Sequence, residues 1–262
     1  MKRSLLTLVT TLMGLGISAQ THLLIPLTAD SSATLEVFLP VQPNGQAVVC
    51  CPGGGYSRLS YQNEGTDWAD FFNAQGIVLA VLKYRMPMGD RSLPMTDAQE
   101  AIRAVRTNAT EWGVDPARVG IMGFSAGGHL ASTTATHAPE EALPSFAILF
   151  YPVISMAEAD THKGSVVNFL GDSRTDETLV ADFTNWKQVT PATPPAIILL
   201  SSDDKAVPPL TNGLPYYEAL VEQGVPATLA AFPTGGHGWG FKDSFPYHHE
   251  MLALLTRWLQ GR

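Results

Sequence analysis

The sequence predicts an α/β fold, with a mostly parallel central sheet covered by helices on both faces. Two observations carry this expectation. Apolar runs typical of buried strands alternate with helix-like stretches along most of the chain, as in parallel sheets joined by crossover helices. The chain also has 262 residues, of which 45% are hydrophobic, so it can bury one sizeable core of the larger α/β kind.

The strands are expected where short apolar runs are bounded by turn residues. The segment TLEVFLP at 34–40 alternates apolar and polar residues, and QAVVCCP at 46–52 is a continuous apolar run that ends in glycines. Continuous apolar runs are typical of strands buried on both faces. Five more such strands are predicted at 77–85, 118–124, 146–152, 195–202 and 227–232.

Helices are expected between these strands. The first, at 65–76, carries Trp68, Phe71 and Phe72 on one face and ends at Gly76, a common stop signal. Further helices are predicted at 97–111, from 126 to about 137, at 214–223 and at 248–260. A polar segment, 153–188, interrupts the alternation and is the candidate for a lid over a functional site.

The amino terminus predicts export. Residues 1–19 are expected to be a secretory signal peptide, followed by a single domain at 20–262. A basic pair precedes an apolar run from Leu5 to Ile17, and the small residues Ser18 and Ala19 suit a cleavage site. Because the run is too short for a stable bilayer anchor, we expect a periplasmic or secreted protein without a membrane anchor.

The charge balance bears on the class of partner. Lys and Arg number 16 against 24 Asp and Glu, which gives a net charge of −8. No basic patch is available for nucleic acid or anionic lipid. A neutral or cationic partner therefore fits the composition better than a polyanion.

The two cysteines are adjacent. Cys50 and Cys51 lie in the apolar run AVVCCP, and neighbouring residues on a strand point to opposite faces, which disfavours a disulfide between them. Both are predicted to be buried strand residues without a redox or metal role.

The motif GFSAGGHLA, at 123–131, offers a nucleophile. Ser125 follows a predicted strand and precedes a predicted helix, with Gly123 and Gly127 allowing the sharp turn of a nucleophile elbow. The alternative is an ordinary serine at a helix start. His129 lies one helical turn further on, where the helix carries it away from the exposed side of the serine. We interpret it as structural, packed at the helix and bonded to a neighbouring loop.

A nucleophilic serine needs a base, and the base needs an orienting carboxylate. Asp203 and Asp204 directly follow the strand at 195–202, and His237 stands between glycines after the strand at 227–232. The order Ser, Asp, His is the one that an α/β-hydrolase requires. Alternation and the spacing in D-x-x-V-P favour Asp204, and the alternative, Asp203, would then be a supporting residue.

The glycine run in CPGGGYS, at 51–57, is predicted to line an oxyanion hole. Backbone N–H groups of Gly54, Gly55 and Tyr56 are the candidate donors from this loop, and Ala126, the residue after the nucleophile, is another. A phosphate-binding loop is the alternative, but no G-K-[ST] accompanies the glycines. The remaining histidines show no familiar metal spacing, and the chemistry requires neither a metal nor an organic cofactor.

These motifs together resemble the α/β-hydrolase superfamily and, within it, secreted bacterial esterases described as acetylxylan esterases or xylanase-associated esterases. The likeness extends from CPGGGYSRLSYQNEG through GFSAGGHLAS to SSDDKAVPP and FPTGGHGWGF. It implies a triad of Ser125, Asp204 and His237, an oxyanion role for the loop 53–56, and hydrolysis of small acyl esters. The implied substrate is an acetylated oligo- or polysaccharide such as acetylated xylan. CPGGG stands where related lipase-like esterases have HGGG, so the glycine backbone is kept without the histidine.

Aromatic side chains near these motifs are candidates for stacking on sugar rings. They are Tyr56, Tyr61, Trp186, Trp239 and Phe241, and only a few of the five are expected to touch substrate, since large aromatics more often serve packing. Two rival functions fit the sequence less well. A peptidase similar to the catalytic domain of prolyl oligopeptidases is disfavoured because the sequence shows no propeller, and a non-catalytic carbohydrate-binding protein is disfavoured by the complete triad.

Overall fold

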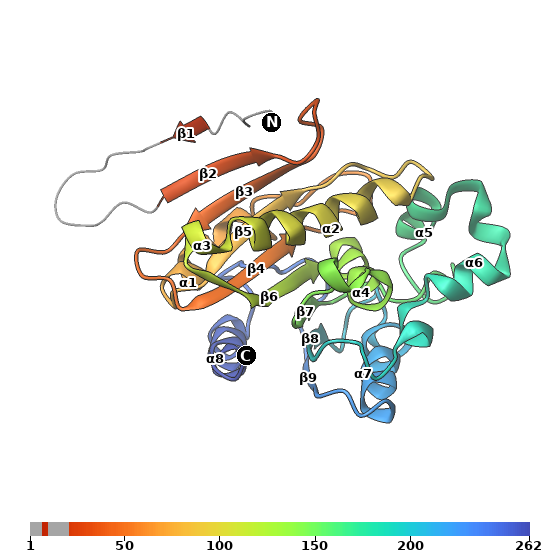
Figure 1. The fold of residues 1–262 in the computed structure, drawn as a ribbon. Helices are drawn as coiled ribbons and strands as arrows, with labels where there is room; N and C mark the ends of the chain where they lie inside the picture. The colour runs from red at the N-terminus through yellow and green to blue at the C-terminus, as the bar shows by residue number, and fades with distance from the viewer. Residues whose placement is uncertain (1–6, 10–20) are drawn as a thin grey trace.

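A computed structural model describes residues 7–9 and 21–262. Among these residues, one sheet of nine strands has the order β1-β2-β3-β5-β4-β6-β7-β8-β9. The strands are β1 (Thr7–Val9), β2 (Thr21–Pro26), β3 (Thr34–Leu39), β4 (Gly45–Cys51), β5 (Val78–Lys83), β6 (Val114–Phe124), β7 (Ala147–Phe150), β8 (Ala196–Ser201) and β9 (Ala227–Phe232). The pairings from β1 to β5 are antiparallel, and those from β5 across to β9 are parallel (Figure 1). The predicted α/β class with a mostly parallel sheet is confirmed.

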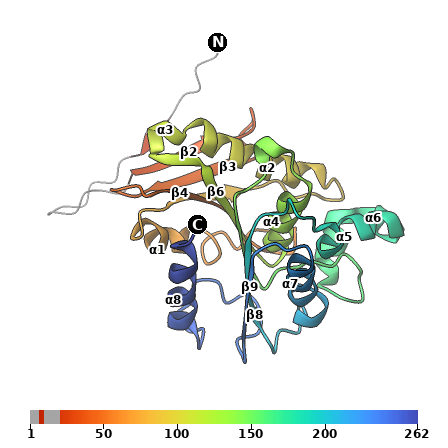
Figure 2. The same ribbon diagram turned by 60° about the horizontal axis from the view of Figure 1, so that its bottom comes forward.

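Helices cover both faces of the sheet. They are α1 (Ala69–Asn73), α2 (Ser92–Thr107), α3 (Ala109–Trp112), α4 (Ala126–His137), α5 (Lys163–Leu170), α6 (Glu177–Asp182), α7 (Gly213–Glu222) and α8 (His248–Leu259). Buried side chains of α2, α4, α5 and α7 pack in one core cluster, whereas those of α1 and α8 pack in the other. Figure 2 shows α1 and α8 on one side of the sheet, with α4 and α7 on the other.

Short 3₁₀ segments complete the architecture and connect the main elements. They are η1 (Thr66–Trp68), η2 (Glu140–Ala142), η3 (Gly171–Thr175), η4 (Asn185–Gln188) and η5 (Pro209–Thr211). The helix predicted at 65–76 is therefore a 3₁₀ turn followed by the short α1, with Trp68 and Phe72 fully buried. The polar segment 153–188 folds into α5, α6 and their adjoining turns.

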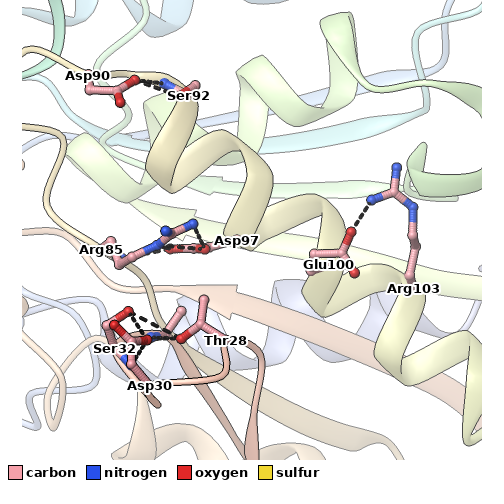
Figure 3. Close-up of polar contacts among 10 residues, drawn as sticks. Thr28, Asp30, Ser32, Arg85, Asp90, Ser92, Asp97, Glu100 and Arg103 are labelled. Carbon is pink, nitrogen blue, oxygen red and sulfur yellow. Dashed lines mark hydrogen bonds and ion pairs between the residues drawn. The ribbon is translucent and has the colours of Figure 1, made fainter. Parts of the chain in front are cut away.

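Helix α2 begins five residues earlier than the sequence indicates. The Asp90 carboxylate accepts the backbone N–H of Ser92 at 3.1 Å, so the first turn has an acceptor there (Figure 3). Further along α2, the buried Asp97 pairs with Arg85, at 2.6 Å between Oδ1 and Nη2, and also accepts the Arg85 backbone N–H. This pair joins α2 to the segment that follows the carboxyl end of β5.

The predicted signal peptide, 1–19, lies outside the described residues except for Thr7–Val9, which pair with β2. β2 lies outside the strands that the sequence predicts, and only Leu23 of its side chains is buried. In the described part of the chain, no helix has the length and apolar character needed to cross a membrane.

The strands β4, β5, β7, β8 and the second half of β6 bury side chains on both faces, as their apolar sequences predict, whereas the residues of the edge strand β9 are half-buried or exposed. Cys50 and Cys51 are fully buried and unbonded to each other, and they belong to different core clusters on opposite faces of β4. Burial raises the pKa of both thiols because a thiolate would lose its hydration. The prediction of buried strand cysteines is confirmed.

Candidate active site

Ser125 occupies a sharp turn between β6, which ends at Phe124, and α4, which begins at Ala126. Its φ of 52° and ψ of −119° are unusual for a residue with a side chain. The turn is held by backbone hydrogen bonds, since the Ser125 N–H donates to Phe150 and its carbonyl accepts from His129 and Val153. The predicted strand–elbow–helix geometry is confirmed.

Two glycines make this turn possible. A Cβ on Gly123 would lie 2.1 Å from the carbonyl oxygen of Gly127, and a Cβ on Gly127 would lie 2.0 Å from the carbonyl oxygen of Cys51. Both distances are far shorter than any real carbon–oxygen contact. The elbow thus packs backbone against backbone, and Ser125 is pushed out beyond the end of the sheet.

Ser125, His237 and Asp204 form one hydrogen-bonded chain. The Ser125 Oγ lies 2.8 Å from His237 Nε2, and His237 Nδ1 lies 2.6 Å from Asp204 Oδ2. The three residues follow β6, β9 and β8, which belong to the parallel run β6-β7-β8-β9 and have their carboxyl ends at one edge of the sheet. The structure therefore brings together all three residues that the sequence predicts as a triad.

The two adjacent aspartates have different partners. Asp204 Oδ1 accepts the N–H groups of Ala206 and Val207, at 2.9 and 3.0 Å, which leaves Oδ2 for the imidazole. Asp203 instead accepts the N–H of Gly236, directly before His237, at 2.8 Å. Asp204 thus orients the histidine ring, and Asp203 holds the loop on which the histidine lies, as the sequence favoured.

The glycine loop lies against the serine. A Cβ on Gly53 would come within 3.0 Å of the Ser125 Cβ and 2.6 Å of the Phe124 carbonyl oxygen. Gly54 and Gly55 have φ values of 133° and 65°, so both need the freedom of glycine. Within residues 21–262, the N–H groups of Gly54, Gly55, Tyr56 and Ala126 donate to no other group. All four have no partner there, and of them Gly54 and Gly55 line the cavity described below, whereas Tyr56 and Ala126 do not.

His129 fixes the far end of this loop. Its Nε2 lies 2.9 Å from the Phe183 carbonyl, which can only accept, so Nε2 carries the proton and Nδ1 accepts the Tyr56 hydroxyl at 2.9 Å. The side chain is fully buried, and this burial lowers the pKa of His129 to about 4. The interpretation of His129 as a structural residue bonded to a neighbouring loop is confirmed.

This buried histidine predicts a loss of stability in acid. Below the ordinary pKa of 6.5 the unfolded chain binds a proton at His129, whereas the folded protein does so only near pH 4. As the pH is lowered from 6.5 to 4, the free energy of unfolding should therefore decrease, by about 3 kcal/mol in total from this one group. Urea unfolding at pH 7, 5.5 and 4.5 measures it, with His129→Gln as the non-titrating comparison. Wild type and variant losing stability in parallel on acidification would contradict the assignment.

A cavity of about 950 Å³ opens over Ser125 and His237. Its lining mixes polar and apolar surface, and the polar side chains in it include Arg58, Gln62, Asn63, Glu64, His162, Asn168 and Lys242. The helix α5 supplies part of the wall, and Asn168 ties it to the glycine loop by donating to the Gly55 carbonyl at 2.8 Å. The predicted lid segment therefore forms one side of the cavity.

Most of the predicted sugar-stacking aromatics lie elsewhere. Tyr56 is buried, and its hydroxyl bonds to His129; Trp239 is buried, donates to Ser201 Oγ and stacks on Phe245. Both predictions were wrong because these rings serve the core. Trp186 lies on η4 away from the cavity lining, and Phe241 packs edge-on against Trp68. Of the five, Tyr61 alone among the described residues lines the cavity.

Two residues beside the triad were not found from the sequence. Glu64 lies at the cavity wall and is buried, with 3% of its surface exposed. Tyr151 follows β7 with a φ of 34°, and its ring centre lies 4.8 Å from that of His237. The sequence signals that could have pointed to them are a single carboxylate shortly after the glycine loop and a tyrosine directly after β7, the strand beside β6, which leads to Ser125. In residues 7–9 and 21–262, no group of three or more His, Cys, Asp or Glu side chains is placed to hold a metal ion.

The parallel sheet, the elbow and the ordered Ser–Asp–His chain define an α/β-hydrolase. The sequence model of the BD-FAE family matches residues 35–213, and the chain belongs to this family. An acetylxylan esterase from Xylanibacter ruminicola is 46% identical over 237 residues, covering 90% of this chain and 49% of the relative. Endo-1,4-beta-xylanase B from Butyrivibrio fibrisolvens is 36% identical over 202 residues, covering 71% of this chain and 31% of the relative. The chain thus spans about half or less of these two relatives.

A solved structure extends the likeness across the fold. The acetyl ester-xyloside bifunctional hydrolase from Caldicellulosiruptor lactoaceticus superposes with a TM-score of 0.83 at 32% sequence identity. The match covers 91% of this chain and 95% of that structure. The similarity therefore includes nearly the whole of a solved hydrolase domain as well as segments of larger relatives.

Proposed function

We propose that this protein is a serine carboxylesterase that removes small acyl groups, above all acetyl, from plant polysaccharide such as acetylated xylan. The observation that carries the proposal is the hydrogen-bonded chain from Ser125 through His237 to Asp204, which faces a cavity beside backbone donors that are unpaired among the described residues. The named activities of the acetylxylan esterase relative and of the acetyl ester-xyloside hydrolase support the acyl group and the sugar. Residues 1–19 support export to the periplasm or medium.

The geometry supports a two-step acyl transfer. His237 Nε2 removes the proton from Ser125 as Oγ attacks the ester carbonyl carbon, and Asp204 holds the resulting imidazolium. The carbonyl oxygen becomes an oxyanion, which accepts hydrogen bonds from the N–H groups of Ala126 and of Gly54 or Gly55. His237 then gives its proton to the departing sugar oxygen, and an acyl-serine remains. Water, deprotonated by His237, attacks this ester and releases acetate and free Ser125.

The cavity supports a sugar on the leaving-group side. His162 accepts the Ser165 backbone N–H through Nδ1 at 3.2 Å, so its Nε2 carries the proton in the neutral ring. Within the described chain that Nε2–H donates to no protein group, and the residue lines the cavity. Gln62 and Arg58 add further donors to the cavity lining. Such donors suit the hydroxyl groups of a sugar.

Product analysis on a panel of substrates tests this function. We expect the wild-type protein to release acetate from acetylated xylan and from an aryl acetate, with little cleavage of a prolyl peptide. Peptide cleavage without ester cleavage would assign the protein to the prolyl oligopeptidase-like alternative. Binding of xylan without release of any acid would instead support the non-catalytic alternative.

A further inference from the structure

We propose that Glu64 is a positioning residue that ties the oxyanion loop to the loop of the catalytic histidine and aligns both for acyl transfer. The proposal rests on the esterase function above. Its basis is a buried carboxylate whose two oxygens each accept a hydrogen bond from a different part of the active site.

The first bond acts on the oxyanion loop. Glu64 Oε2 accepts the backbone N–H of Gly53 at 2.9 Å, and Gly53 is the loop residue packed against Ser125. This bond occupies the Gly53 donor and fixes the peptide from which the loop continues. The next donors, on Gly54 and Gly55, are thereby held beside the nucleophile with no partner of their own among the described residues.

The second bond acts on the histidine loop through Tyr151. The Tyr151 hydroxyl donates to Glu64 Oε1 at 2.7 Å and accepts the N–H of Gly240 at 2.9 Å. The accepted bond leaves the hydroxyl proton to point at Glu64. Its ring packs edge-on against His237, with 4.8 Å between ring centres. Glu64 thus reaches the His237 loop at two points, one backbone bond and one ring contact.

The charge of Glu64 also acts on His237. The Gly53 N–H and the Tyr151 hydroxyl both donate to the Glu64 carboxyl group, an arrangement that suits its ionised form. Burial raises the pKa of Glu64, and these two bonds and the charges of His237 and Lys242 counteract that rise. The other titratable groups around it are Cys50 on β4, whose thiol donates to the Glu64 carbonyl, and the Tyr84 phenol. A negative charge held here favours the imidazolium that forms as Ser125 loses its proton.

Three variants test the proposal with an aryl acetate as substrate. Glu64→Gln keeps the size of the side chain but presents an amide N–H₂ to one of the two donors, and Tyr151→Phe removes only the hydroxyl. Each should lower kcat by about 10- to 100-fold with a small change in KM, since the misplaced groups act on the transition state. The double variant should lose much less than the product of the two single losses, because both residues act through one bridge.

The pH profile separates this role from a loss of packing. In Glu64→Gln the acid limb of kcat/KM should move to lower pH, because the neighbouring negative charge that favours the imidazolium is gone. Glu111→Gln, an exposed glutamate, is the matched control and should keep both kcat and the limb. If Glu64→Gln does not fold, the kcat of Tyr151→Phe with the aryl acetate tests the proposal on its own.

Wild-type kcat in both folded single variants, with an unmoved acid limb, would overturn the role of Glu64. That result differs from a failure of the proposed function, in which wild type and Glu111→Gln would themselves release no acetate. Strictly additive losses in the double variant would contradict the bridge and leave Glu64 and Tyr151 as separate packing residues.

Discussion

Replacing His237 with alanine is expected to lower kcat for aryl acetate hydrolysis by about a million-fold, the scale seen when a serine hydrolase loses its base. The reason is that, in the part of the chain that the structure describes, Ser125 Oγ has one basic partner, His237 Nε2 at 2.8 Å. A serine hydroxyl is a very weak acid, so without that partner no group would take its proton as Oγ attacks the ester. Steady-state kinetics on the purified variant, with its fold checked by circular dichroism, measures the loss.

The matched comparison is His129→Gln, four residues after the nucleophile. His129 Nδ1 already accepts the Tyr56 hydroxyl, and its Nε2 donates to Phe183, so neither nitrogen is free for Ser125. We expect this variant to keep kcat within about tenfold of wild type, the effect of about one hydrogen bond on the oxyanion loop. If it folds normally yet loses as much rate as His237→Ala, the base is assigned wrongly.

Replacing Asp204 with asparagine is expected to lower kcat by about ten thousand-fold. The asparagine Oδ1 can still accept from Ala206 and Val207, so the turn should persist. The amide nitrogen would then face His237 Nδ1 and favour the tautomer whose Nε2 carries a proton and cannot accept from Ser125. The kcat measured at the pH optimum reports this loss directly.

Asp203→Asn supplies the control for the neighbouring position. Among the described residues, the Asp203 carboxylate accepts only the Gly236 N–H, and an asparagine oxygen can keep that bond. We expect a loss of kcat below about tenfold, which corresponds to one weakened hydrogen bond. Equal losses at the two positions would mean that the pair orients His237 jointly and would reject the assignment of Asp204 alone.

Much of the fold follows from linear signals in the sequence. The helix after the elbow begins at Ala126 and the strand β9 runs from Ala227 to Phe232, both at their predicted bounds. Apolar runs and glycines are local, and the ends of parallel strands meet at one edge, so the order of Ser125, Asp204 and His237 was enough to bring them together.

Side-chain partners distant in sequence were harder to predict. The bridge from Glu64 to Tyr151 joins residues 87 positions apart, and neither residue carries a local motif. The same limit explains the errors at Tyr56 and Trp239, whose rings turn into the core toward His129 and Phe245. Aromatic character signals both packing and sugar binding, and only the direction of the ring separates the two.

The central claim is that Ser125 is an activated nucleophile. A fluorophosphonate tests it most directly, since attack by an activated serine expels fluoride and leaves a stable phosphonyl ester. Peptide mass spectrometry should find one phosphonyl group, on Ser125, formed in proportion to the loss of acetate release, and none at that site in His237→Ala. Complete inactivation with the group on another residue, or full acetate release from protein labelled at Ser125, would contradict the account.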